Sequence, residues 1–264
     1  MNGVEELLDP VAKSAYIDME FGAVYGTHQR LNIPIEIGAV IYNPRSDELE
    51  ISGKKFYFDI DVEKWGNVVD KLGRTINVKA RVINLKTPDT PKTYDKKFCL
   101  DPQSKKNALK ISRIIHNNLH GYMQNLAKNN VRTLIFFAKE RETLTLRRAG
   151  FNTNNLVCLD LQKESKESLS LKQSMSLDRL SYIIKFQIFN TTIHSEHYTY
   201  TIPEKYQYLI KPHKAIGDTA RMFLLSKELY HHTDTLKEKI ESYLALCEKE
   251  AIASKKNQTL KDLK

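Results

Sequence analysis

The sequence predicts an α/β fold in which a mixed sheet is flanked by helices. Two observations predict it. Three closely spaced strand patterns stand near the N-terminus, and apolar strands that alternate with helical patterns follow them. Strands joined by short turns pair antiparallel, whereas strands joined through helices pair parallel. We therefore expect three antiparallel strands followed by parallel strands in one sheet.

The first half of this sheet rests on three short runs rich in β-branched and aromatic residues, at 14–24, 33–43 and 54–62. The stretches between them, 25–32 and 44–53, contain residues typical of turns. Such spacing predicts an antiparallel meander.

A more polar segment, 63–106, follows the third run. It holds one alternating stretch, "INVKARVINL", and the loop-like "TPDTPKTYDKK". We interpret the segment as an insertion into the domain, built from a hairpin and a loop; an ordinary surface ribbon is the alternative.

The second half of the sheet begins after this insertion. Apolar residues at helical spacing predict a helix over 108–128. A buried strand at 131–138, a helix at 139–150 that ends at Gly150, and another strand at 156–161 come next. This alternation is typical of a parallel half-sheet.

The C-terminal third is mainly helical. A polar connector at 164–174 precedes a helix over 177–189 that Ser176 can cap, and Pro212 opens a stretch, 213–230, with apolar residues at helical spacing from Ala215 on. A last amphipathic helix starts near the capping box of Thr235 and Glu238. We expect one domain at 1–232, then a C-terminal helix and frayed basic tail at 233–264 that offers a surface for a protein partner or for self-association.

Composition favours a soluble protein with a polyanionic partner. The formal net charge is +9 and the pI is about 9.2, which favours nucleic acid over a membrane surface. The three cysteines are far apart, and no apolar stretch reaches the length of a membrane span. A cytoplasmic location follows as the expectation.

Two carboxylates stand two residues apart in the first run, "YIDMEFGAVYG". Because side chains of a strand alternate between its faces, Asp18 and Glu20 are expected on the same face. Neighbouring like charges in an apolar setting are stabilised by a divalent cation held by oxygen ligands. The alternative for such a pair is an edge strand with one solvated face, and the pair by itself does not decide between them.

A second polar group occurs near the other end of the chain, in "HKAIGDTA". Five helical steps turn the chain by about 500°, which leaves two side chains roughly 140° out of alignment. His213 is therefore expected in the turn before the helix, and Asp218 in its first turn.

These motifs resemble the DEDDh, or DnaQ-like, 3′–5′ exonuclease family, whose fold is ribonuclease H-like. The resemblance rests on the D-x-E of the first strand, the second strand "IPIEIGAV" and the late "HKAIGDTA", and it spans residues 14–230. The helix "SLDRLSYIIKF" is similar to one that the family places before its histidine.

The resemblance implies a function and a set of site residues. Asp18, Glu20 and Asp218 correspond to ligands of two Mg²⁺ or Mn²⁺ ions, and His213 corresponds to the general base. The implied reaction is hydrolysis of the 3′-terminal phosphodiester of single-stranded DNA or RNA by two metal ions. A histidine can accept a proton from water near neutral pH.

The sequence departs from the family at the second motif. The helix after the fourth strand normally carries an aspartate, but "LIFFAKERETLTL" has none. Glu142 is the preferred replacement as metal ligand, since Leu146 fills the apolar position four residues on; Glu140 with Leu144 fits almost as well. Both glutamates also suit a helix N-terminus. The alternative function is a nucleic-acid-binding module with weakened catalysis.

Other residues near these motifs have two interpretations. Phe21 replaces the usual threonine, so Phe21 and Gly22 are candidates for contact with the terminal nucleotide, while a core role suits Phe21 equally well. Asp160, at a strand end, is interpreted as structural. The histidine pairs His116/His120 and His231/His232 have no companion ligand nearby in the sequence, which favours surface or capping roles.

Overall fold

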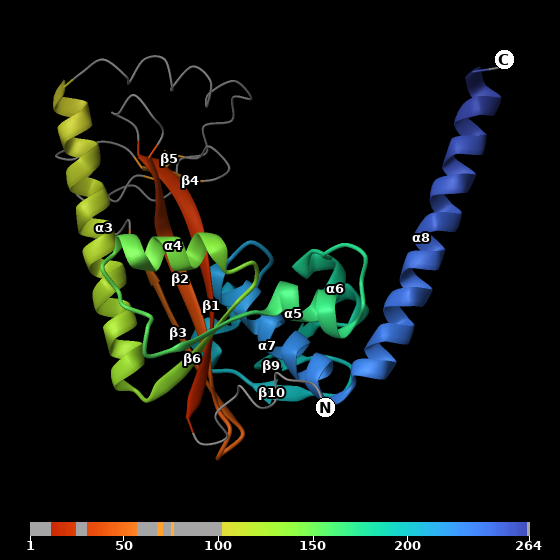
Figure 1. The fold of residues 1–264 in the computed structure, drawn as a ribbon, viewed down its shortest axis with the longest axis horizontal. Coiled ribbons are helices and arrows are strands. Elements are labelled where there is room, and N and C mark those ends of the chain that lie inside the picture. Colours follow the sequence, from red (N-terminus) through yellow and green to blue (C-terminus); the bar gives the residue numbers. More distant parts are fainter. Residues whose placement is uncertain (1–11, 25–30, 57–67, 71–74, 77–101, 263–264) are drawn as a thin grey trace.

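A mixed seven-stranded sheet with helices on both faces forms the centre of the molecule (Figure 1). The structure, a computed structural model, describes residues 12–24, 31–56, 68–70, 75–76 and 102–262. The sequence prediction of an α/β fold with antiparallel and then parallel strands is confirmed at this level.

The sheet is built around its first strand. In spatial order its antiparallel part is β3-β2-β1, and β6 and β7 add parallel strands beyond β1. Two short strands, β4 and β5, continue the sheet antiparallel from the C-terminal end of β1, on the same edge of β1 that β6 uses. The bounds are β1 Lys13–Val24, β2 Leu31–Asn43, β3 Glu48–Lys55, β4 Val68–Asp70, β5 Thr75–Ile76, β6 Val131–Phe136 and β7 Val157–Asp160.

One edge of β1 is shared by two strands. β6 pairs with its first residues, from Lys13 to Tyr16, and β4 pairs with its last, from Gly22 to Val24. Among the described residues no strand pairs with this edge over 17–21. The middle of β1, which carries Asp18 and Glu20, therefore has no described strand beside it on that side.

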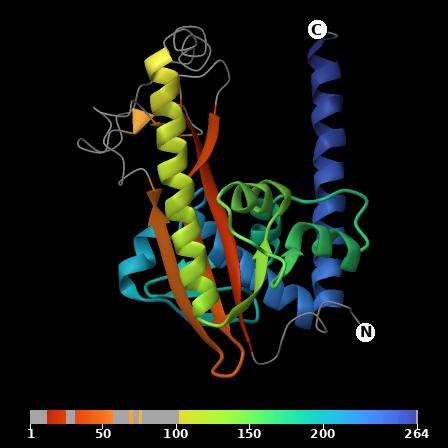
Figure 2. The same cartoon turned by 60° about the vertical axis from the view of Figure 1, so that its left-hand side comes forward.

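Each face of the sheet has its own apolar core. Helices α3 (Pro102–Lys128) and α4 (Glu140–Arg148) cover one face, and α3 runs along the strands in both views (Figures 1 and 2). Helix α7 (Ala215–His231) covers the other with α5 (Leu161–Ser168) and α6 (Leu177–Ile183). Odd-numbered residues of β1 such as Ile17 belong to the first core, while Tyr16 belongs to the second. Alternation along β1 thus directs Asp18 and Glu20 toward α7.

The C-terminal part adds a small sheet and a long helix. Strands β8 (Gln187–Phe189), β9 (Thr192–His194) and β10 (Thr199–Thr201) form an antiparallel sheet before the 3₁₀ helix η2 (Glu204–Leu209). Helix α8 (Thr233–Asp262) packs on α7 and α6 through its first turns, where Leu236 and Ile240 are buried. Its remaining turns project from the body (Figure 1).

The third predicted strand was wrong in position. It was expected at 54–62, with 44–53 as a turn, but β3 occupies Glu48–Lys55 and the turn is only 44–47. The alternation of Leu49 and Ile51 carries the strand, and the polar residues between them face outward. Residues 57–62 lie outside the described ranges.

Two boundaries in the C-terminal third also differ from the prediction. The polar connector expected at 164–174 begins as helix α5, because Asp160 caps it by accepting the Lys163 N–H at 3.1 Å. The helix expected over 177–189 has its predicted cap, Ser176, but ends at Ile183. Lys185 then adopts a positive φ of 56°, which stops the helix before β8.

The remaining expectations concern the insertion and the chain end. Helix α3 starts at Pro102, so 102–106 is helical, and 77–101 lies outside the described ranges. The tail expected to fray from 253 continues α8 to Asp262, in keeping with its lysine, alanine and leucine content. In the described part of the chain, no helix has the length and apolar character needed to cross a bilayer.

Candidate metal centre

Three carboxylates from opposite ends of the chain meet between the sheet and α7. One oxygen from each of Asp18, Glu20 and Asp218 lies within 4.8 Å of the others. Glu20 is 8% exposed, while Asp18 and Asp218 are half-buried. The three oxygens are close enough to share a cation, and carboxylate oxygens are the ligands that Mg²⁺ and Mn²⁺ prefer.

Close contact between α7 and the sheet brings Asp218 to the strand. Gly38 on β2 lies opposite Asp18, and a Cβ at that glycine would come within 2.4 Å of the backbone carbon of Ala215. Glu36, opposite Glu20, accepts a hydrogen bond from the Ala215 N–H at 3.3 Å. The glycine and the carboxylate together seat the first turn of α7 over the two acidic residues of β1.

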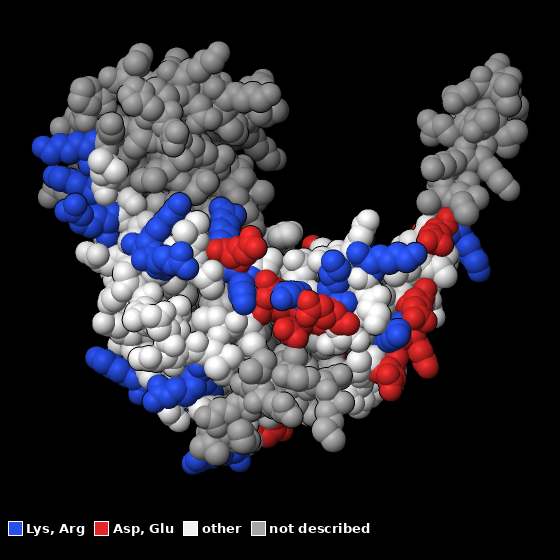
Figure 3. All heavy atoms as spheres, viewed as in Figure 1, with Lys and Arg blue, Asp and Glu red and all other residues white. Residues whose placement is uncertain are grey.

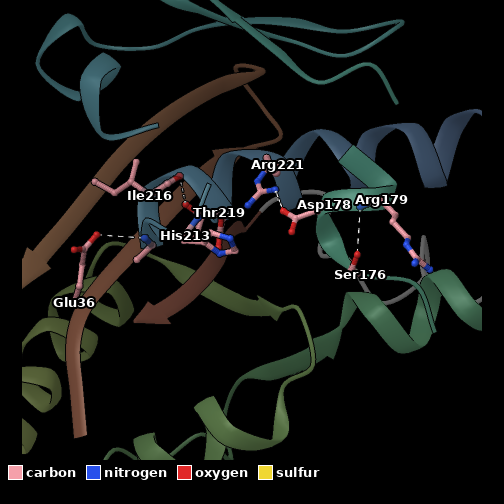
Figure 4. Close-up of polar contacts among 10 residues, drawn as sticks. Glu36, Ser176, Asp178, Arg179, His213, Ile216, Thr219 and Arg221 are labelled. Carbon is pink, nitrogen blue, oxygen red and sulfur yellow. Dashed lines mark hydrogen bonds and ion pairs between the residues drawn. The ribbon is translucent and has the colours of Figure 1, made fainter. Parts of the chain in front are cut away.

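His213 lies in the turn that precedes α7, as the sequence predicts (Figure 4). Its φ is +60°, and its backbone N–H donates to Asp218 Oδ1 at 3.3 Å. Gly217 lets the segment before α7 lie against the first turn of the helix, since a Cβ at position 217 would lie 2.1 Å from the Lys211 carbonyl oxygen. The side chain of His213 is exposed, so solvent can reach the imidazole.

A buried arginine is tied to the cluster. Arg221, 4% exposed, forms ion pairs with Asp218 one helical turn earlier and with Asp178 on α6; Figure 4 shows Arg221 and Asp178 directed toward each other. The guanidinium therefore neutralises one carboxylate of the cluster and fixes its rotamer. Sequence reasoning missed this residue, although the Asp218–Arg221 spacing of three on a helix is a signal for such a pair.

Glu142 lies apart from the three carboxylates, on α4. It is 8% exposed and its Oε2 has no hydrogen-bond partner in the described structure. Burial raises the pKa of Glu142 to about 7. Glu140, the other candidate of the second motif, is exposed. The structure thus distinguishes the two glutamates by burial, and a ligand role for Glu142 stays a prediction.

Helix α4 nevertheless contacts β1 next to Glu20 in the sequence, on the opposite face of the sheet from the cluster. The Arg141 guanidinium carbon lies 3.7 Å from the centre of the Phe21 ring, and Phe21 follows Glu20 directly. The Phe21 ring is 6% exposed and belongs to the core on the α3 side, so contact with a nucleotide requires Arg141 to move. Gly22 is buried and pairs with β2 and β4; its contact with substrate also stays a prediction.

Asp160 has a structural role. Besides capping α5, its carboxylate accepts the backbone N–H groups of Ala138 and Lys139, at 3.3 and 3.1 Å. Ala138 has a positive φ of 62°. Asp160 therefore fixes the turn between β6 and α4, and with it the start of the helix that carries Arg141 and Glu142.

No protein-family model matches this sequence, and no curated protein matches it either. The geometry of the site therefore carries the functional argument.

Proposed function

We propose that the protein is a metal-dependent 3′–5′ exonuclease that hydrolyses single-stranded nucleic acid. The meeting of Asp18, Glu20 and Asp218 within 4.8 Å carries the proposal. The mixed sheet is compatible with a ribonuclease H-like fold, and β1 carries the first two carboxylates near its centre.

The donor set fits hard divalent cations. Asp18, Glu20 and Asp218 would hold Mg²⁺ or Mn²⁺. Glu142 stays a candidate for a further ligand, although α4 would have to move to bring it there, because α4 packs on the other face of the sheet. The unpartnered, buried Oε2 of Glu142 supports this, because such an oxygen is satisfied by a proton or by a cation. Two such ions, when bound, would supply an activated water and neutralise charge on the phosphate oxygens.

The chain's own residues supply proton transfer and positioning. The exposed imidazole of His213 would take a proton from water, and the hydrogen bond from the His213 backbone N–H to Asp218 Oδ1 keeps the residue beside the cluster. Arg221 holds the Asp218 carboxylate in place. Rigid placement of these groups lowers the entropic cost of reaching the transition state.

The charged surface supports a polyanionic substrate. Basic side chains gather over α3 and α4 in the view of Figure 3. On α4 they run from Arg141, next to Phe21, to Arg147 and Arg148, and on α3 they include Lys106, Lys110 and Arg113. Contacts of this kind with phosphates give affinity that falls with salt concentration.

Two observations favour a second candidate, a nucleic-acid-binding module with weak or no hydrolysis. Glu142, the best replacement for the second-motif aspartate, lies outside the carboxylate cluster. Arg221 also competes with a cation for Asp218. Both features lower the expected affinity for a second ion.

A nuclease assay separates the two candidates. Single-stranded DNA and RNA labelled at the 5′ end are incubated with Mn²⁺, Mg²⁺ or EDTA and resolved on a denaturing gel. The exonuclease predicts a metal-dependent ladder that shortens from the 3′ end and disappears in Asp18→Asn and Asp218→Asn. Asp234→Asn, an exposed acidic position on α8, purified identically, serves as the matched control.

Each outcome has a defined meaning. A ladder that persists in Asp18→Asn would show that another nuclease or another site is responsible, and would contradict the proposal. Salt-sensitive binding of both substrates without any ladder would instead establish the binding module.

A further inference from the structure

A second cluster of metal-ligating side chains lies at the other end of α7. One ligand atom from each of His197, Glu228 and His232 lies within 4.8 Å of the others. His197 comes from the turn between β9 and β10, while Glu228 lies in the last turns of α7 and His232 directly follows that helix. Residues from two separate parts of the chain thus meet at one point, as metal ligands do.

The spacing on α7 explains half of this cluster. Glu228 and His232 are four residues apart, and the His232 N–H still donates to the Glu228 carbonyl oxygen at 2.9 Å, which keeps the two residues one helical turn apart. His232 adopts a φ of −133° as the helix ends. Two ligands at this spacing form one side of a metal site, and a third ligand from elsewhere completes a three-residue set.

His197 completes the set and is held in place by Glu228. Its backbone N–H donates to Glu228 Oε1 at 2.9 Å, and its Nδ1 lies 2.7 Å from Oε2. The His197 and His232 rings stack with centroids 3.9 Å apart and planes 18° apart. The three groups therefore lie together without an ion. A metal lies in the plane of each imidazole that binds it, so the stacked rings must turn before both point at one ion.

Burial separates this cluster from an ordinary surface group. Glu228 is only 3% exposed, so its carboxylate is shielded from water, whereas the His197 side chain is 34% exposed. The Tyr198 hydroxyl lies 3.3 Å from His232 Nε2. Metal-ligating histidines almost always use one ring nitrogen for the ion and the other for such an orienting partner.

We propose that His197, Glu228 and His232 form a zinc site, with solvent water as the fourth ligand. Two imidazoles and one carboxylate with an open position suit Zn²⁺, while Mg²⁺ prefers oxygen ligands. The ion would fasten the β9–β10 turn to the junction of α7 and α8. It would lie at the opposite end of α7 from Asp218, and so be distinct from the carboxylate cluster.

The test is a Zn²⁺ titration against a chromogenic chelator, followed by the visible absorption spectrum of the Co²⁺-substituted protein. Both are done in a background with Asp18→Asn and Asp218→Asn, so that the carboxylate cluster does not contribute. We expect one Zn²⁺ per chain, and a Co²⁺ spectrum typical of four-coordinate nitrogen and oxygen ligation. His197→Ala and His232→Ala should each weaken Zn²⁺ binding at least about 10-fold.

His231→Ala is the matched control, because His231 is the neighbouring histidine in the sequence and is not part of the cluster. It should leave Zn²⁺ affinity unchanged. Glu228→Gln should also weaken binding, and circular dichroism of each variant confirms that it is folded. The absence of a stoichiometric site would overturn the proposal. So would binding that His197→Ala and His232→Ala leave intact, since Cys158, Cys247 or other histidines would then hold the ion.

Discussion

Gly38 pairs with Asp18 across the β1–β2 ladder, and the space of its missing side chain is taken up by the first turn of α7. Gly38 thus sets how closely α7, and with it Asp218, approaches Asp18 on β1. Asp218 reaches Asp18 and Glu20 in part because this backbone position has no Cβ.

Gly38→Ala should therefore damage the site. Its Cβ would lie 2.4 Å from the Ala215 backbone carbon, so α7 must move away from the sheet. We expect unfolding by urea to show a loss of about 1–3 kcal/mol, together with weaker Mn²⁺ binding. Gly121→Ala on α3, where nothing lies within 4 Å, should instead stabilise by about 0.5–1 kcal/mol. Equal stability of the two variants would contradict the packing described.

Arg221→Gln should make the stability of the folded protein depend more strongly on added Mn²⁺. Loss of the guanidinium leaves Asp218 beside Asp18 and Glu20 without its counter-charge. We expect the metal-free protein to lose about 1–3 kcal/mol of stability, and Mn²⁺ to raise the melting temperature more in the variant than in the wild type. Arg179→Gln, at an exposed position on α6, is the control. An identical Mn²⁺ response in Arg221→Gln and wild type would show that the arginine does not compete with the ion.

The buried Glu142 should make stability depend on pH in EDTA. Its pKa in the folded protein, about 7, lies above the ordinary value of 4.5. The folded state therefore favours the protonated carboxyl group. The stability that this group contributes is fully present below pH 4.5 and is lost as the pH rises through 7. A shift of this size corresponds to about 3 kcal/mol.

Glu142→Gln removes this dependence, because glutamine stays neutral. The difference in unfolding free energy between variant and wild type should grow in favour of the variant from pH 4.5 to above 7. Glu140→Gln, two residues away and exposed, should show no such trend. A flat difference for Glu142→Gln would mean that the carboxyl group is solvated in the folded state.

His213→Ala should slow hydrolysis without preventing metal binding. The imidazole is not part of the carboxylate cluster, and the backbone N–H that contacts Asp218 remains in the variant. Loss of a general base typically costs about 10²–10⁴-fold in rate. Single-turnover rates together with Mn²⁺ affinity measure the two effects separately; an unchanged rate would assign the proton transfer to another group.

Helix α8 should be held to the body only by its first turns. Leu236 is 3% exposed and Leu246 is 55% exposed. Leu236→Ala should lower the free energy of unfolding by about 2–5 kcal/mol. Leu246→Ala should change it by less than about 0.5 kcal/mol. A large loss for Leu246→Ala would show that this part of the helix is covered in solution, for instance by a second copy of the chain.

Local patterns in the sequence were sufficient to predict the strand and the helix that carry the three carboxylates. Strand alternation placed Asp18 and Glu20 on one face, and helical geometry separated His213 in its turn from Asp218 in the first turn of α7. Periodicity and capping depend on neighbouring residues only, so they can be read from the sequence. The third strand was predicted too late in the chain because 44–53 was interpreted as a turn, whereas pairing with β2 keeps residues 48–53 in a strand.

The tertiary structure decided which polar groups meet. Arg221 reaches both Asp178 and Asp218, Gly38 admits α7 to the sheet, and His197 joins Glu228 and His232. These contacts join residues far apart in the chain, and their geometry depends on how closely helices approach strands. No local spacing encodes that distance, because it results from the packing of the whole core. The sequence thus determined the candidate ligands, and the packing determined that Asp18, Glu20 and Asp218 lie together while Glu142 lies apart.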